Sequence, residues 1–156
     1  MNITTRLAAL ALGASVITGG AFAVPAGAAT KPPTVKQVND QVGLVVNDER
    51  DAIAQYNMYE LAQVQTICQG QATHATALKA LARPKRYPKA TWKILMQGAD
   101  AYAKGASECV AAAQRAIDTR GHENDTSGFQ QVKLDWSAGN ALFNKASAAL
   151  AKANIH

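Results

Sequence analysis

The sequence predicts an all-α protein, an antiparallel helical bundle of three long helices and a short N-terminal helix, closed by one disulfide. Three observations predict this fold. Apolar residues recur at alternating steps of three and four along most of the chain. Proline and glycine interrupt these runs at only a few positions. The two cysteines fall on the apolar faces of two different runs.

The first 28 residues predict a cleaved export signal. Arg6 precedes an uncharged apolar run over residues 7–23, and Ala26-Gly27-Ala28 supplies the small side chains that a signal peptidase requires. Ala21-Phe22-Ala23 is a second candidate cleavage site. The most apolar part is shorter than the roughly 20 residues of a membrane span, which favours cleavage over anchoring. The sequence therefore predicts a secreted, extracellular protein with a signal peptide over 1–28, an extended segment over 29–34 and a helical domain over 35–156.

The net charge of the predicted mature chain is small. Removing Arg6 from the 16 Lys and Arg leaves 15 against 11 Asp and Glu, a net charge of +4. Such a charge is consistent with solubility and with weak attraction to anionic surfaces, but it identifies neither. The length of the mature chain suits a single domain.

The first half of the domain predicts two helices. Residues 35–82 lack proline, and one helix of that length would span about 72 Å at 1.5 Å per residue, well beyond its partners. Asp48 and Asp51 resemble the acidic start of a helix, where the helix dipole favours negative charge. We therefore expect a short helix over 35–46 and a long one over 48–82.

The second half predicts two further long helices. The clearest apolar stripe covers 88–120, with Pro88 at the helix start and Gly121 as the stop. A polar turn over 121–125 follows, and the last helix begins at a cap formed by Thr126 or Ser127. Its stripe includes the following residues: Phe129, Val132, Trp136, Gly139, Phe143, Ala146 and Leu150.

Cys68 and Cys109 predict a disulfide between the two longest helices, because an exported chain with two cysteines typically pairs them. The expected hairpin is out of register, however, since Cys109 lies about seven residues too far from the turn. That excess is about 10 Å along a helix, more than a disulfide can bridge. Either residues 83–93 are partly irregular or the chain bends near Gly70, and we favour the first.

The stretch 83–93 is the strongest candidate for a binding site. It combines five cations, two prolines and two aromatics at a predicted hairpin tip. Clustered Lys and Arg attract phosphate polymers, and aromatic rings can stack on bases or sugars. The hypothesis is a non-enzymatic binding module for an anionic wall polymer, extracellular nucleic acid or lipid headgroup. Its candidate contact residues are Arg83, Lys85, Arg86, Tyr87, Lys89, Trp92 and Lys93.

Three alternatives make different structural demands. A solvated loop needs only prolines that separate two helices. A carrier of a small apolar ligand needs a sizeable cavity between helices, and a protease inhibitor needs residues 83–93 to form a rigid, protruding loop. The polyanion hypothesis needs Tyr87 and the five cations on one exposed face.

No other constellation predicts chemistry. The sequence lacks a nucleophile motif, a metal-ligand pattern and a haem motif, so we predict no catalytic residue, metal or cofactor. We expect the polar residues beside the apolar stripe of the first half to be solvated; they are Glu49, Asn57, Glu60, Gln71 and His74. The matching spacings Gly98/Tyr102 and Gly139/Phe143 do not extend into a sequence repeat. Alanine at many seam positions predicts close helix packing with little room for a large internal ligand.

Overall fold

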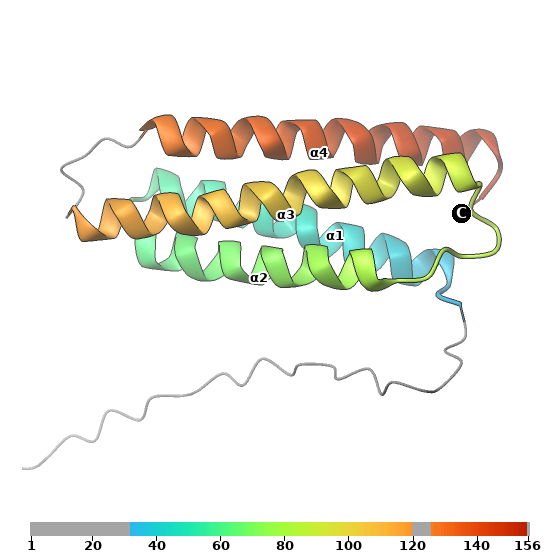
Figure 1. Cartoon of the computed structure of the whole chain (residues 1–156), viewed down its shortest axis with the longest axis horizontal. Helices are drawn as coiled ribbons and strands as arrows, with labels where there is room; N and C mark the ends of the chain where they lie inside the picture. Colours follow the sequence, from blue (N-terminus) through green and yellow to red (C-terminus); the bar gives the residue numbers. More distant parts are fainter. Residues whose placement is uncertain (1–31, 120–125, 156) are drawn as a thin grey trace, which may run out of the picture. The chain divides into compact units, whose positions relative to one another are not determined.

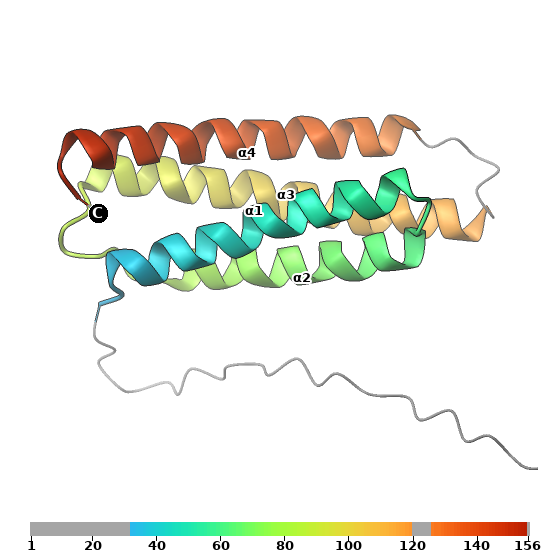
Figure 2. The same ribbon diagram turned by 180° about the vertical axis from the view of Figure 1, so that it is seen from behind.

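The computed structural model describes residues 32–119 and 126–155. These residues form four α-helices and no strand: α1 Val35–Asn57, α2 Leu61–Ala80, α3 Lys89–Asp118 and α4 Thr126–Lys152. The helices pack side by side as a bundle (Figures 1 and 2). The predicted signal peptide over 1–28 and the predicted turn over 121–125 lie outside the described residues.

The helix boundary in the first half lies about ten residues later than predicted. α1 continues through Asp48 to Asn57, and the break falls at residues 58–60. The expected short helix over 35–46 and long helix over 48–82 are therefore wrong, and the bundle has four helices of 20 to 30 residues. Residues 35–80 do form two helices, as their length predicts, because a single helix would overhang its partners. Asp48 and Asp51 instead lie within α1.

A Schellman motif produces the break, although no glycine is present. The N–H of Glu60 donates to the carbonyl of Gln55, and the N–H of Tyr59 donates to that of Tyr56. Tyr59 adopts the left-handed conformation, with φ 62°, where glycine is the usual residue. The lack of glycine or proline at this turn explains why the sequence pattern did not reveal it.

The apolar stripes of α3 and α4 form the core as predicted. Tyr102, Phe129, Trp136, Phe143 and Leu150 are all buried. Trp92 and Val110, in the same helix α3, are only partly buried and pack against the edge of the core. The period of three and four therefore locates the core faces of both helices correctly.

The matching Gly98/Tyr102 and Gly139/Phe143 spacings have a packing role. The ring of Phe143 lies against Gly98, and the ring of Tyr102 lies against Gly139. The two rings stack on each other with centroids 5.2 Å apart. Each helix thus supplies one aromatic ring and one gap, which allows α3 and α4 to approach closely.

The predicted disulfide is confirmed. Cys68 in α2 is bonded to Cys109 in α3, and their Cα atoms are 6.0 Å apart. The register is accommodated by an irregular segment over 81–88, while residues 89–93 are helical and Gly70 lies inside α2. Lys79 at the end of α2 pairs with Asp100, about three turns into α3. The start of α3 therefore extends past the end of α2, and the segment 81–88 covers that length (Figure 1).

The helices do not pack equally. α3 packs extensively along α2 and α4, and α2 packs along α1, whereas α1 and α4 touch at few positions. Among the described residues, none of the helices combines the length and the apolarity needed to cross a bilayer. The seam between α1 and α4 is thus the open side of the bundle.

Candidate functional site

The segment between α2 and α3, residues 81–88, is anchored to the bundle by Tyr87. The side chain of Tyr87 is 1% exposed, and its hydroxyl donates to Oδ1 of Asn39 in α1 at 3.3 Å. Its ring meets that of Trp92 edge-on, with centroids 5.8 Å apart. Burial raises the pKa of the Tyr87 hydroxyl, so it stays protonated as a hydrogen-bond donor. The expectation that Tyr87 shares an exposed face with the cations is wrong, because its ring completes the core.

Arg83 also has a structural part. Its guanidinium donates to the carbonyl of Tyr87, closing a short loop, and the N–H of Tyr87 donates to the carbonyl of Pro84 at 3.0 Å. Pro84 is buried, and Pro88 caps the start of α3. These contacts hold the backbone of the segment in one conformation. Arg83 is therefore a brace for the loop, with its charge only partly exposed.

The other four cations of the stretch form an exposed group, which we call the basic surface. They are Lys85, Arg86, Lys89 and Lys93. In the part of the chain that the structure describes, none of the four forms an ion pair with an acidic side chain. The sequence explains this, because it contains no Asp or Glu between Glu60 and Asp100. Trp92, between two of these lysines in sequence, is half-buried.

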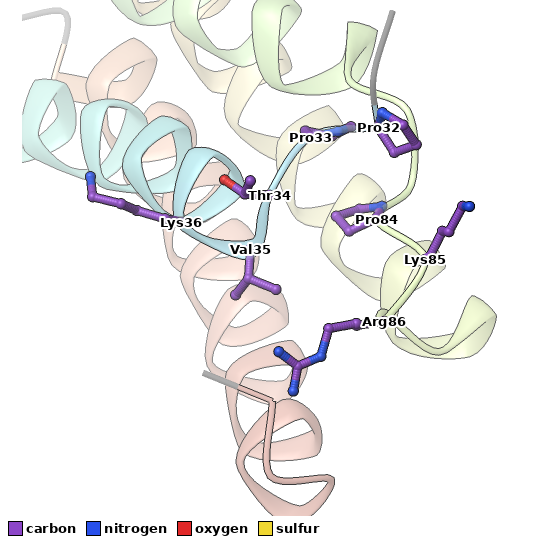
Figure 3. A pocket seen from close by; sticks show the side chains of 8 residues that line it. All are labelled: Pro32, Pro33, Thr34, Val35, Lys36, Pro84, Lys85 and Arg86. Atoms are coloured by element: carbon purple, nitrogen blue, oxygen red, sulfur yellow. The ribbon is translucent and has the colours of Figure 1, made fainter.

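A pocket of about 590 Å³ adjoins the basic surface. The start of α1 lines one side with Val35 and Lys36, and the loop lines the other with Pro84, Lys85 and Arg86. Figure 3 shows Arg86 extending from the loop toward Val35. Lys36 is already paired with Asp40 at 2.7 Å, so the pocket's unpaired charge comes from the loop.

A second hollow lies along the open seam, and we call it the α1/α4 groove. Its main part has a volume of about 530 Å³ and ends near the loop at Asn39. Further along α1 it adjoins a smaller hollow of about 290 Å³ that shares Val46 and contains Glu49. The apolar residues that line the main part are Val42, Val46, Leu95, Phe143, Leu150, Ala151 and Ile155.

The C-terminal residues complete this groove. The N–H of Ile155 donates to the carbonyl of Leu150, and Asn154 takes the left-handed conformation with φ 52°. This second Schellman motif turns Ile155 back against Leu150, so both side chains line the same hollow. The alanine-rich seam positions, which predicted little room for a large internal ligand, gave no indication of this groove between α1 and α4.

Glu49 marks the far part of the groove. Its Oε2 accepts hydrogen bonds from the hydroxyl of Tyr102 at 2.5 Å and from Nδ2 of Asn140 at 2.8 Å. These bonds connect α1 with both α3 and α4. Burial, followed by the contact with Glu49, raises the pKa of Tyr102. Glu49 was expected to be solvated, and it is instead half-buried with two partners.

The other polar residues of the first half are divided between core and surface. Gln71 is fully buried and donates to the carbonyl of Val45 at 3.0 Å, so its predicted solvation is wrong. Nδ1 of His74, which is half-buried, donates a 2.6 Å hydrogen bond to Oδ2 of Asp48. Glu60 and Asn57 are exposed, as expected. Within residues 32–119 and 126–155, no group of three or more His, Cys, Asp or Glu could hold a metal ion.

The site therefore consists of two neighbouring features at one end of the bundle. One is the basic surface, whose four cations lie on the loop and on the first turns of α3 and have no ion pair among the described residues, and the other is the α1/α4 groove. Asn39 contacts both features, because it accepts a hydrogen bond from Tyr87 in the loop and also lines the groove. No protein-family model, curated protein or solved structure matches the chain.

Proposed function

We propose that this chain is an exported, non-enzymatic binding module that contacts an anionic polymer or surface through its basic surface. The observation that carries the proposal is the absence of ion pairs, among the described residues, at Lys85, Arg86, Lys89 and Lys93. Cations that have no acidic neighbour in the fold are free to neutralise phosphate or carboxylate groups of a partner, and counterion release then favours binding.

The rigidity of the loop supports the same function. Tyr87 and Arg83 fix the backbone that carries Lys85 and Arg86, through bonds to Asn39 and to the Tyr87 carbonyl. A loop that is ordered before binding loses less conformational entropy when it meets its partner. Lys89 and Lys93 lie one turn apart on α3, which is rigid as well.

The buried aromatics narrow the mode of contact. Tyr87 is buried and Trp92 is half-buried, so neither offers a full ring face for stacking on bases. Recognition of nucleic acid through base stacking needs exposed aromatics. The contact is therefore with charged backbone or headgroup atoms, and it is independent of base sequence. Wall polymers, extracellular nucleic acid and lipid headgroups all supply such groups.

Export and helix direction belong to the same proposal. A disulfide is typical of proteins that work in an oxidising compartment, which supports the predicted signal peptide. We also infer that consecutive helices run antiparallel. Along α3 from Gly98 to Gly105, the partner on α4 moves back from Phe143 to Trp136, as expected for antiparallel neighbours.

The packing of the loop does not favour a protease inhibitor. A protease must grip an extended segment that protrudes, whereas Pro84 and Tyr87 are both buried against the bundle. The ligand-carrier alternative is favoured by a separate observation, the α1/α4 groove.

The test is retention on immobilised heparin, double-stranded DNA and teichoic acid. The variant replaces Lys85, Arg86 and Lys89 with Gln and keeps Arg83, since Arg83 braces the loop. A matched control replaces Arg50, Lys133 and Lys145, three exposed cations outside the basic surface, and loses the same charge. We expect retention to be lost in the first variant and kept in the control. An equal loss of retention in both variants would show that binding depends only on net charge, which would contradict the proposal.

A further inference from the structure

We propose that the α1/α4 groove binds a single-chain anionic amphiphile, with the alkyl tail in the groove and the anionic head at the loop end. This is a second site beside the basic surface, and it does not depend on polymer binding. The proposal follows from three properties of the groove: its lining, the distribution of charge along it, and its accessibility on the open side of the bundle.

The lining selects an apolar chain. The main hollow has a volume of about 530 Å³, within the roughly 300–1,000 Å³ typical of small-molecule sites. Val42, Val46, Leu95 and Phe143 contribute to its wall, and among the described residues no charged side chain lines it. From Asn39 to Ile53 the main hollow and its extension follow 14 residues of α1, about 21 Å. An elongated hollow of this kind suits an alkyl chain better than a compact ring system.

The charges at the two ends orient the ligand. The extension is lined by Glu49 and by Arg50, and Arg50 is paired with Asp51 at 3.2 Å, so among the described residues the extension offers an anionic head no unpaired cation. The opposite end, at Asn39, is bonded to Tyr87, the residue after the exposed Arg86 of the basic surface. The polar side chains of the main hollow, Asn39 and Ser147, are both exposed. An anionic head therefore belongs at the loop end, with the tail directed toward Glu49.

The sparse contact between α1 and α4 makes the groove accessible. A tail can enter from the side because these helices touch at few positions, whereas the other seams are closely packed. Gly43 contributes to this access, because it lines the groove and a Cβ there would meet no atom within 4 Å. The lack of a side chain at Gly43 therefore leaves this side of the groove open.

The position of Gly43 provides a sharp test. In Gly43→Leu the new side chain projects into the hollow, and the change also raises helix propensity, so the protein should fold. Gly70→Leu is the matched control, because Gly70 is also helical and also faces open space, but lines none of these hollows. Circular dichroism and thermal melting establish that both variants retain the fold.

Binding of dodecanoate and octanoate is measured by titration calorimetry below their micelle concentrations, with dodecyltrimethylammonium as the cationic control. We expect one dodecanoate per chain, at least tenfold weaker binding in Gly43→Leu and unchanged binding in Gly70→Leu. Octanoate should bind at least tenfold more weakly than dodecanoate, because each buried methylene contributes a factor of roughly four. Dodecyltrimethylammonium should also bind more weakly than dodecanoate. Arg86→Gln should weaken the binding of dodecanoate but not that of dodecyltrimethylammonium.

Several outcomes would overturn the proposal. These are no saturable binding of dodecanoate, equal affinity in Gly43→Leu and wild type, or no preference for the anionic head. Sedimentation velocity tests a further outcome. If the wild type is a dimer and Gly43→Leu is a monomer, a second copy of the chain occupies the groove. Heparin retention of Gly43→Leu separates the two proposals: it should equal that of wild type, whatever the result with dodecanoate.

Discussion

The ring of Phe143 packs against Gly98 so closely that a Cβ at position 98 would lie 2.6 Å from the Cδ1 and Cε1 atoms of the ring. The same ring also stacks on Tyr102, with centroids 5.2 Å apart. The carbonyl oxygen of Gly139 lies 3.3 Å from the same Cβ position. The close approach of α3 and α4 therefore depends on the missing side chain at Gly98.

Gly98→Ala should destabilise the protein. Overpacking a filled core costs about 1–3 kcal/mol, whereas alanine in place of helical glycine contributes only about 0.5–1 kcal/mol. We expect a net loss of about 1–2 kcal/mol in urea unfolding. Gly43→Ala is the control, since its Cβ meets open space, and it should gain about 0.5–1 kcal/mol. A gain in both variants would mean that the α3/α4 contact is looser than described.

Phe143→Ala should cost about 3–5 kcal/mol, the range for removing a buried aromatic side chain. Phe143 is 7% exposed and stacks on Tyr102. Leu134→Ala, on the same helix but 64% exposed, serves as the control and should change the free energy of unfolding by less than about 0.5 kcal/mol. A loss below 1 kcal/mol for Phe143→Ala would show that α4 presents a different face to the core.

The sequence predicted the fold wherever local signals and tertiary packing agree. The stripes of α3 and α4 gave the core faces correctly because each has a single apolar side at a regular period. The break between α1 and α2 was misplaced because Tyr59 adopts a left-handed conformation that favours glycine. The position of this turn is set by the packing of α1 against α2. The length of the segment predicts that a turn exists but not at which residue it occurs.

The disulfide should be quantitative and stabilising. Because Cys68 and Cys109 are bonded and fully buried, alkylation without reductant should label neither residue, as measured by intact mass. Replacing both with Ala opens a loop with a sequence separation of 41 residues. On the chain-entropy estimate, this lowers the free energy of unfolding by about 4 kcal/mol. Detection of two free thiols in the native protein would contradict the pairing.

Asp135 should contribute to stability in a pH-dependent way. Desolvation acts to raise its pKa, but hydrogen bonds from Lys104 and neighbouring side chains outweigh it, so the folded-state pKa is lowered below 3.8. Lys104 reaches both carboxylate oxygens at 3.1 Å. The stabilisation is therefore present above pH 3.8 and is lost as the pH falls through the lowered folded-state pKa.

The measurement compares melting temperatures of wild type and Asp135→Asn between pH 2 and pH 7. We expect the variant to melt at a lower temperature near pH 6 and the difference to shrink below pH 3.8. Lys104→Gln should show the same pH trend because it removes the donor. A difference that is constant down to pH 2 would indicate a packing effect of the substitution and no linkage to protonation.

The sequence identified the basic stretch but not which of its residues are structural and which are exposed. Five cations in eleven residues were evident, yet only the structure distinguishes Arg83, which braces the loop, from the exposed Lys85 and Arg86. Tyr87 was predicted as a contact because aromatics between cations suit nucleic-acid binding. Tyr87 is instead buried and bonded to Asn39, 48 positions away, and no local pattern encodes such a contact. The α1/α4 groove was missed for the same reason.

The last prediction concerns the salt dependence of polyanion binding. With three to five ionic contacts, log K against log salt concentration should have a slope of about −2 to −4, because each neutralised phosphate releases a fraction of a counterion. The measurement is fluorescence anisotropy with labelled single- and double-stranded DNA of mixed sequence. Affinity should not depend on base sequence, since the aromatics of the stretch are withdrawn into the core.

Replacing Lys85, Arg86 and Lys89 with Gln should remove up to three contacts and reduce the slope by about 2 to 3. The melting temperature should stay nearly unchanged, because exposed charges contribute little to folding. The charge-matched variant at Arg50, Lys133 and Lys145 should keep the wild-type slope, since these residues lie outside the basic surface. A wild-type slope in the first variant, or binding that ignores salt, would place the contact on another face of the bundle.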